Sequence, residues 1–280
     1  MLRLTFLGLA LLSAIAVVGI RTASADTPEV DLALVLAVDV SRSMDPQEQQ
    51  LQRDGYVEAF RRPEVIQAIQ SGAMGKIAVT YVEWAGPNYH DIEVPWTVIT
   101  SAADANAFAD KLAAAPIGHE FGTSISGGLL FAQSLFADSG VNDDRRTIDV
   151  SGDGPNNAGN PVVPTRDAVV ASGITINGLP IIIHKDAYDY FGIANLDVYY
   201  HDCVIGGPGA FMIPITGTEN FEDATRRKLV TEIAEASRPE LSPDARIIPA
   251  ADIATPPATT ATDCMIGEKR RGTFMPNFDH

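Results

Sequence analysis

A nearly continuous apolar run at residues 32–38 ends abruptly in Asp39. A run of this kind indicates a strand buried on both faces, which is typical of a parallel sheet covered by helices. Further apolar runs predict other strands of the same sheet, and they lie at residues 76–84, 145–150, 174–183 and 210–215.

Residues 91–99 have a different pattern, because polar and apolar positions alternate and Pro95 interrupts them. Alternation with an internal proline predicts an edge strand with one face in solvent, here the antiparallel partner of the strand before it. Helical spacing of apolar residues fills the intervals between the strands. The predicted helices are 45–70 with a break at Pro63, 101–114, 123–138, 162–172, 194–201 and 221–236.

Strands that alternate with helices of crossover length predict an α/β fold. We expect a doubly wound, mostly parallel central sheet of about six strands, with one antiparallel edge strand and helices on both faces. The domain should occupy residues 26–237. Residues 238–280 lack any period, and we expect a C-terminal tail there that is extended or disordered.

Residues 1–25 resemble a signal peptide in their order of features. Arg3 is followed by an apolar core, and Ala23-Ser24-Ala25 is a small-residue cleavage site. An uncleaved anchor is the alternative. With cleavage, we expect an exported, periplasmic or secreted protein without a membrane span.

The 280 residues carry a formal net charge of −16, which becomes −18 when the two arginines of residues 1–25 are removed. So acidic a chain is not expected to bind nucleic acid or anionic lipid through its general field. The two cysteines, Cys203 and Cys264, are most simply one disulfide in an oxidising compartment, and two free buried thiols are the alternative.

Three segments place oxygen-bearing side chains at the same predicted edge of the sheet. Asp39, Ser41 and Ser43 follow the first strand, Thr123 stands before a helix, and Asp153 follows the strand at 145–150. Carboxylates and hydroxyls suit hard cations, so we expect Mg²⁺, or Mn²⁺ or Ca²⁺ in its place. For the first segment alone, capping of the next helix is an equally good interpretation.

Together these segments resemble the metal-ion-dependent adhesion site of von Willebrand factor type A domains. The motifs are Asp39-Val-Ser41-Arg-Ser43, Thr123 in Phe-Gly-Thr-Ser, and Asp153 in Ser-Gly-Asp-Gly, and the resemblance covers about residues 31–236. It extends to an exported bacterial subgroup of unassigned role. The resemblance implies a protein or peptide partner that presents a carboxylate to the metal. The connector with Tyr199, Tyr200 and Cys203 departs from the general family pattern.

Two other functions have to be compared with this one. A hydrolase could use Ser124 or Asp39, but Ser126 stands where a nucleophile elbow needs its second glycine. Ser41 stands where an aspartyl-nucleophile phosphatase would need a second acid. The domain could also be a structural or assembly subunit without metal-dependent binding. The sequence does not indicate an oligomeric state.

Overall fold

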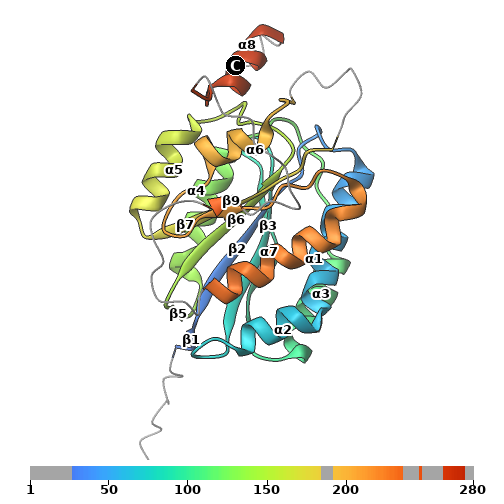
Figure 1. Ribbon diagram of the computed structural model, residues 1–280, viewed down its shortest axis with the longest axis vertical. Coiled ribbons are helices and arrows are strands. Elements are labelled where there is room, and N and C mark those ends of the chain that lie inside the picture. The colour runs from blue at the N-terminus through green and yellow to red at the C-terminus, as the bar shows by residue number, and fades with distance from the viewer. Residues whose placement is uncertain (1–26, 184–191, 236–245, 248–260, 275–280) are drawn as a thin grey trace, which may run out of the picture.

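A computed structural model describes residues 27–183, 192–235, 246–247 and 261–274 (Figure 1). Residues 1–25, interpreted above as a signal peptide, lie outside the described residues. The described strands are β1 (Glu29–Val30), β2 (Leu32–Asp39), β3 (Ile77–Trp84), β4 (His90–Ile99), β5 (Asn142–Asp143), β6 (Arg146–Gly152), β7 (Ile174–Pro180), β8 (Phe211–Met212) and β9 (Arg246–Ile247).

Within the described residues, seven strands form one sheet in the order β4-β3-β2-β6-β7-β8-β9. All neighbours are parallel except β3 and β4, so the antiparallel edge strand is confirmed. β2 lies near the centre and all its residues are buried, as its apolar run predicted. β1 and β5 form a small separate parallel pair.

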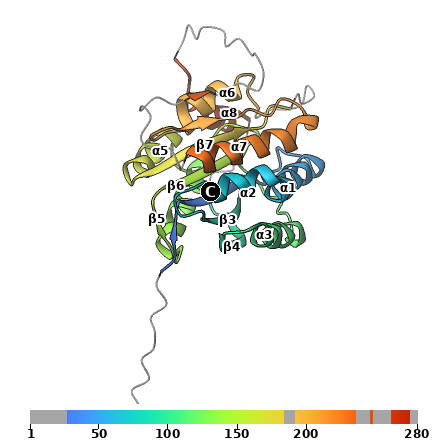
Figure 2. The ribbon, with the colours of Figure 1, turned by 60° about the horizontal axis from the view of Figure 1, so that its bottom comes forward.

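Helices cover both faces of the sheet (Figures 1 and 2). The α-helices are α1 (Pro46–Arg61), α2 (Pro63–Gln70), α3 (Ala102–Ala114), α4 (Ile125–Leu135), α5 (Val162–Ala171), α6 (Leu196–Tyr199), α7 (Phe221–Glu235) and α8 (Ile266–Phe274). Shorter turns are the 3₁₀ segments Phe136–Asp138 and Thr218–Asn220 and the π-helical turn Tyr200–Val204.

Each face of the sheet has its own hydrophobic core. On one face, Leu34 and Leu36 of β2 pack with residues of α1, α2, α3 and α7. On the other face, Val35 and Ala37 pack with residues of α4, α5 and the α6 segment. Because successive residues of a strand point to opposite faces, one uninterrupted apolar strand serves both cores. The doubly wound α/β architecture is confirmed.

Local signals place the helices that flank the sheet. Asp45 accepts hydrogen bonds from the backbone of Gln47 and Glu48, and Glu48 returns one, which forms a capping box before Pro46. Pro63 separates α1 from α2, as predicted.

Trp84 is fully buried, and its indole lies where a side chain on Gly128 of α4 would stand.

Two segments of the predicted C-terminal tail form regular elements. Arg246–Ile247 pairs with β8, and Ile266–Phe274 forms α8. α8 is short and rich in charge, so it has no apolar stripe to reveal it in the sequence. Its first turn is instead fixed locally, because Asp263 accepts hydrogen bonds from the backbone N–H groups of Met265 and Ile266. No helix among the described residues is both long and apolar enough to cross a membrane.

Candidate metal centre

The loop after β2 presents the first three predicted side chains. The Ser41 N–H donates to Asp39 Oδ1 over 2.7 Å, which folds the loop back on the end of its own strand. The Ser41 and Ser43 hydroxyl oxygens lie 2.8 Å apart. Asp39 and Ser41 are buried, whereas Ser43 is half-buried. The alternating positions therefore bring a carboxylate and two hydroxyls to one side of the loop.

Thr123 reaches the same place from the loop before α4. Its hydroxyl donates to Ser41 Oγ over 3.4 Å. The two loops are also joined through their backbones, since the Arg42 N–H donates to the Glu120 carbonyl over 2.8 Å. The Glu120 N–H donates in turn to the Val40 carbonyl over 3.1 Å. The separation between these two segments is consequently fixed by main-chain bonds.

Asp153 completes the group from the loop after β6. Ser43 Oγ donates to Asp153 Oδ1 over 2.6 Å, although 110 positions separate the two residues. Asp153 is buried like Asp39. β2 and β6 are parallel neighbours, so their carboxyl ends meet at one edge of the sheet. The structure thus brings together all five residues predicted as metal ligands.

Two asparagines tie the Asp153 loop to the Thr123 loop, and the sequence reasoning did not identify their role. Asn157 Oδ1 accepts from the Thr123 N–H over 2.9 Å, and the Asn157 N–H donates to the Thr123 carbonyl over 2.8 Å. Asn156 Oδ1 accepts from the Ser126 N–H over 3.0 Å. Asparagine is common in turns, and here its side-chain amide also bonds one loop to another.

The chemistry of this donor set fits a hard divalent cation. Every side chain in it offers oxygen, which Mg²⁺, Mn²⁺ and Ca²⁺ prefer over nitrogen or sulfur. Among the described residues, no group of three or more His, Cys, Asp or Glu side chains could hold a metal. Asp39 and Asp153, the two carboxylates of this set, together match the charge of one divalent ion.

A tyrosine lies beneath the acidic pair. Tyr200 is fully buried, and burial raises the pKa of its phenol well above the usual value, with the charges of Asp39 and Asp153 adding to the effect. The phenol is consequently a neutral hydrogen-bond donor at physiological pH. Tyr200 belongs to the connector that departs from the general family pattern.

An arginine and a phenylalanine lie on the outer rim of the centre. Arg42 stands between Ser41 and Ser43, is exposed, and places its guanidinium carbon 3.8 Å from the centroid of the Phe121 ring. The Phe121 side chain is 69% exposed, which is unusual for a large apolar residue. The sequence offered no signal for this pair, because residues 79 positions apart meet only through the loop-to-loop bonds.

Ser124, the candidate nucleophile if the protein were a hydrolase, has a structural role. It is fully buried, and its hydroxyl accepts from the Gly127 N–H over 3.1 Å as the N-cap of α4. The Ser126 hydroxyl lies 3.4 Å away. A buried hydroxyl that caps a helix is poorly placed to attack a substrate.

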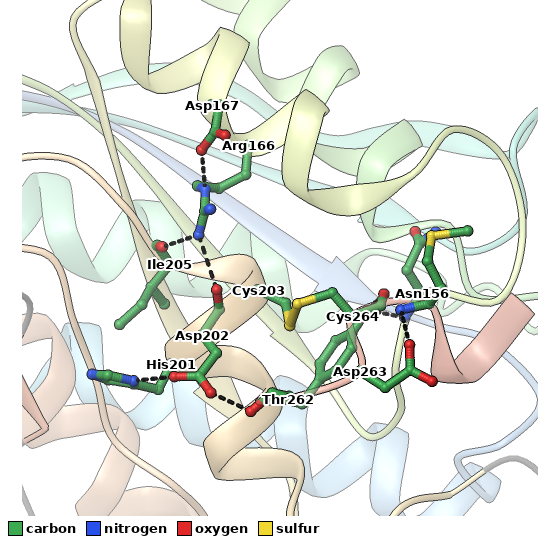
Figure 3. Close-up of a disulfide and its surroundings, with 12 residues drawn as sticks. Asn156, Arg166, Asp167, His201, Asp202, Cys203, Ile205, Thr262, Asp263 and Cys264 are labelled. Carbon is green, nitrogen blue, oxygen red and sulfur yellow. Dashed lines mark hydrogen bonds and ion pairs between the residues drawn. A yellow bond between two sulfur atoms is a disulfide. The ribbon is translucent and has the colours of Figure 1, made fainter. Parts of the chain in front are cut away.

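The predicted cysteine pair is confirmed as a disulfide, with 5.6 Å between the Cα atoms of Cys203 and Cys264 (Figure 3). The bond joins the π-helical turn to the segment before α8. Next to it, the Thr262 hydroxyl donates to the carboxylate of Asp202. Arg166 of α5 donates to the carbonyls of Asp202 and Ile205 (Figure 3).

The disulfide holds α8 against the Asp153 loop. Asn156 Nδ2 donates to Glu268 Oε1 over 2.7 Å. A side chain on Gly267 would stand only 2.0 Å from the Asn156 carbonyl oxygen, so the helix backbone approaches the loop as closely as a glycine permits. Tyr199 bridges the two segments, because its hydroxyl accepts from the Asn156 N–H and donates to the Cys264 carbonyl.

Comparison with known proteins gives a family and a fold. Residues 29–237 match the model of a family described as "Protein of unknown function (DUF1194)". No curated protein matches the chain. Proximal thread matrix protein 1 from the mussel byssus aligns with a TM-score of 0.54 at 14% identity, over 75% of this chain and 49% of that one. The pilus adhesin SpaC from Lactobacillus rhamnosus GG aligns with a TM-score of 0.54 at 15% identity, over 76% and 31%.

Two further solved structures resemble the chain more distantly. One is a von Willebrand factor type A protein from Catenulispora acidiphila, with a TM-score of 0.47 at 13% identity, over 74% of this chain and 43% of that one. The other is the mussel protein with a zinc-occupied MIDAS motif, with a TM-score of 0.48 at 15% identity, over 71% and 46%. The chain spans about half of the mussel protein and about a third of the adhesin. Its α/β fold is the one that it shares with the mussel thread protein and the pilus adhesin.

Proposed function

The chain belongs to the DUF1194 family, and we propose that it is a binding module that recruits an acidic group of a protein or peptide through a divalent cation. The observation that carries this proposal is the meeting of oxygen side chains from three separate loops at the carboxyl edge of the sheet. Together, the hydroxyls and carboxylates of the β2, α4 and β6 loops form the kind of oxygen donor set that hard cations prefer.

The proposed cation is Mg²⁺, with Mn²⁺ or Ca²⁺ as substitutes. Five side chains would hold it, namely Asp39, Ser41, Ser43, Thr123 and Asp153. Two carboxylates balance the charge of the ion, and neutral hydroxyls add coordination without adding charge. The bound ion supplies an electrophilic position for an incoming carboxylate, while the protein's loops fix where that carboxylate arrives.

The rim of the centre supports an acidic partner. Arg42 adds an exposed positive charge next to the two serines in a chain whose net charge is −16. Phe121 adds an exposed apolar surface beside it. Together they suit a peptide in which a second acid or an apolar side chain accompanies the acid at the metal.

The same geometry argues against hydrolysis as the main activity. Ser124 caps a helix from a fully buried position. Asp39 accepts from the Ser41 N–H and faces a serine where a phosphatase would need its second acid. We therefore propose a non-catalytic role.

We also propose that the protein is exported. The Cys203–Cys264 disulfide fits an oxidising compartment, and disulfides of this kind are rare in the cytosol. The signal-peptide pattern of residues 1–25 points to the same compartment. A periplasmic or secreted location would place the acidic domain among envelope or extracellular proteins.

The first test of the proposal is the thermal unfolding of the chelator-treated protein with and without MgCl₂ or MnCl₂. Metal that binds only the folded state stabilises it by about 2.7 kcal/mol at a concentration of 100 Kd, which raises Tm. Asp39→Ala and Asp153→Ala should abolish the rise. Asp54→Ala is the matched control, because Asp54 is an exposed acid of α1 that contacts Gln50. A metal response that survives in both site variants would refute the assignment.

The second test concerns the ligand. Immobilised protein is incubated with periplasmic extract in MgCl₂ or in chelator, with Asp153→Ala as the matched bait. We expect partners retained only by the wild-type bait and only with metal, and displaced by excess Gly-Asp-Gly peptide but not by Gly-Asn-Gly. Partners held equally by both baits, or insensitive to both peptides, would mean that the carboxylate–metal contact does not drive binding.

A further inference from the structure

Tyr200 is a buried side chain that the fold alone does not explain. It is fully buried, and its hydroxyl has no hydrogen-bond partner among the described residues. A buried hydroxyl in that condition lowers the stability of the fold, so such groups are rare without a reason. The neighbouring Tyr199 shows the contrast, because its hydroxyl is bonded to both Asn156 and Cys264.

The surroundings of Gly152 show where the Tyr200 hydroxyl lies. A Cβ on this last residue of β6 would stand 2.9 Å from the Tyr200 hydroxyl oxygen and 2.9 Å from Asp39 Oδ2. The phenol and the carboxylate therefore flank the same glycine, directly beside Asp153 in the chain. Tyr200 is fully buried, whereas Arg42 and Phe121 of the rim are exposed.

A second glycine makes room for the ring itself. On the adjacent strand β7, a Cβ on Gly178 would stand 2.8 Å from Tyr200 Cδ1. Two neighbouring strands, β6 and β7, thus each have a glycine where Tyr200 packs against the sheet. An aromatic ring could fill this space without a hydroxyl, so packing explains the ring but not the oxygen beside Asp39.

We propose that Tyr200 is a positioning residue of the metal centre, whose hydroxyl donates a hydrogen bond to the Asp39 carboxylate, directly or through one water, when the cation is bound. This inference rests on the proposed function. A hydrogen-bond donor behind a metal-binding carboxylate fixes the orientation of that carboxylate. Loss of such an outer partner commonly lowers metal affinity by about 10- to 100-fold. Tyr200 thereby sets how tightly this centre holds its cation.

The test compares Tyr200→Phe with the wild-type protein by calorimetric titration of MgCl₂ and MnCl₂. We expect Kd to rise about tenfold in the variant. The metal-free variant should unfold at the same or a higher temperature, because the change removes a buried hydroxyl that lacks a partner. General damage to the fold would lower both metal affinity and metal-free stability, whereas here only metal affinity should fall.

Tyr81→Phe is the matched control. Tyr81 is equally buried, but its hydroxyl accepts from Arg53 on the α1 side of the sheet. The control should leave Kd unchanged. A second readout is the ultraviolet difference spectrum of tyrosine on addition of metal, which we expect in wild type and in Tyr81→Phe but not in Tyr200→Phe.

The outcomes separate this inference from the function on which it rests. If wild-type protein does not bind the metals, or if Asp39→Ala binds them normally, the proposed function fails. If wild type binds and Tyr200→Phe has a Kd within twofold of it, the role of Tyr200 alone is refuted. Should the variant not fold, the wild-type difference spectrum decides, because its absence at metal saturation would contradict a hydroxyl placed beside Asp39.

Discussion

A buried ionic cluster beneath α7 gives a prediction whose size can be worked out from the structure. Lys228 is fully buried and donates to Asp149 Oδ1 over 2.6 Å and to Glu232 Oε1 over 2.5 Å. Glu232 Oε1 also accepts from Asn177 of β7, and Tyr56 of α1 donates to Asp149 over 3.4 Å. One lysine therefore faces two carboxyl groups that water does not reach.

The excess acid in this cluster makes Glu232 hard to ionise. Burial first, and the charge of Asp149 second, raise the pKa of Glu232 to about 7 from an ordinary value of 4.5. The folded state therefore favours the protonated acid. The contribution of Glu232 to the unfolding free energy is fully present below pH 4.5 and is lost as pH rises through about 7. At 1.36 kcal/mol per pH unit, the full difference is about 3 kcal/mol.

The perturbation is Glu232→Gln, which keeps the shape of the protonated acid and its Oε1 acceptor for Lys228 and Asn177. We expect wild type to lose about 3 kcal/mol of unfolding free energy relative to this variant between pH 5 and pH 8. Urea unfolding followed by circular dichroism at four pH values across that range measures the difference directly. Comparing the two proteins removes the contributions of titrating groups outside this buried cluster.

Glu222→Gln is the control, because Glu222 lies on the same helix but is exposed and paired with Arg62 at the surface. Its difference from wild type should stay nearly constant across the pH range. Two results would refute the reasoning for Glu232. One is that the unfolding free energies of wild type and Glu232→Gln depend on pH in parallel. The other is that wild type gains stability relative to the variant as pH rises.

Two further predictions concern the metal centre and its support. Gly152→Ala should abolish the Mg²⁺-induced rise in Tm, because its Cβ would stand 2.9 Å from the Asp39 carboxylate. Gly154→Ala, whose Cβ would meet nothing within 4 Å, should keep the rise, and equal responses of the two variants would contradict the geometry. Reduction of the disulfide, or the double change Cys203→Ser and Cys264→Ser, should cost up to about 4 kcal/mol of unfolding free energy in urea titrations. An unchanged midpoint would mean that the bond carries no stability.

The sheet was predictable because its signals are local. The unbroken apolar run before Asp39 identifies a doubly buried strand wherever the rest of the chain lies. Pro95 and its alternating neighbours identify an edge in the same way. The sheet has seven strands among the described residues rather than about six, because β9 pairs through two residues of a segment without periodicity. Two-residue strands leave no pattern to detect.

For the candidate metal centre, the meeting of the proposed ligand side chains was predictable, but their surroundings were not. Asp39, Thr123 and Asp153 each follow a recognisable strand or precede a recognisable helix, so parallel topology alone puts them at one edge. Tyr200 is different, because its place depends on a π-helical turn and on two bare glycines in other strands. Contacts of that kind arise from tertiary packing, and no local pattern encodes them.

The bonds between the loops bear on how the centre works. Main-chain bonds join the Asp39 loop to Glu120, and paired amides join Thr123 to Asn157. These bonds are made by backbone and asparagine amide groups, none of which belongs to the proposed ligand set. The loops are therefore positioned by protein contacts, and metal binding does not have to supply the cost of ordering them.

The tail takes part in the same support. α8 presses Gly267 onto the Asn156 carbonyl, and Asn156 in turn bonds to the first turn of α4 through Ser126. The Cys203–Cys264 bond keeps α8 in that position. A segment expected to be extended or disordered thus contacts the loop that presents Asp153. This support acts through Asn156 and α8 rather than through the proposed ligands. Breaking it should therefore weaken the centre by loosening one loop, although every proposed ligand stays in the sequence.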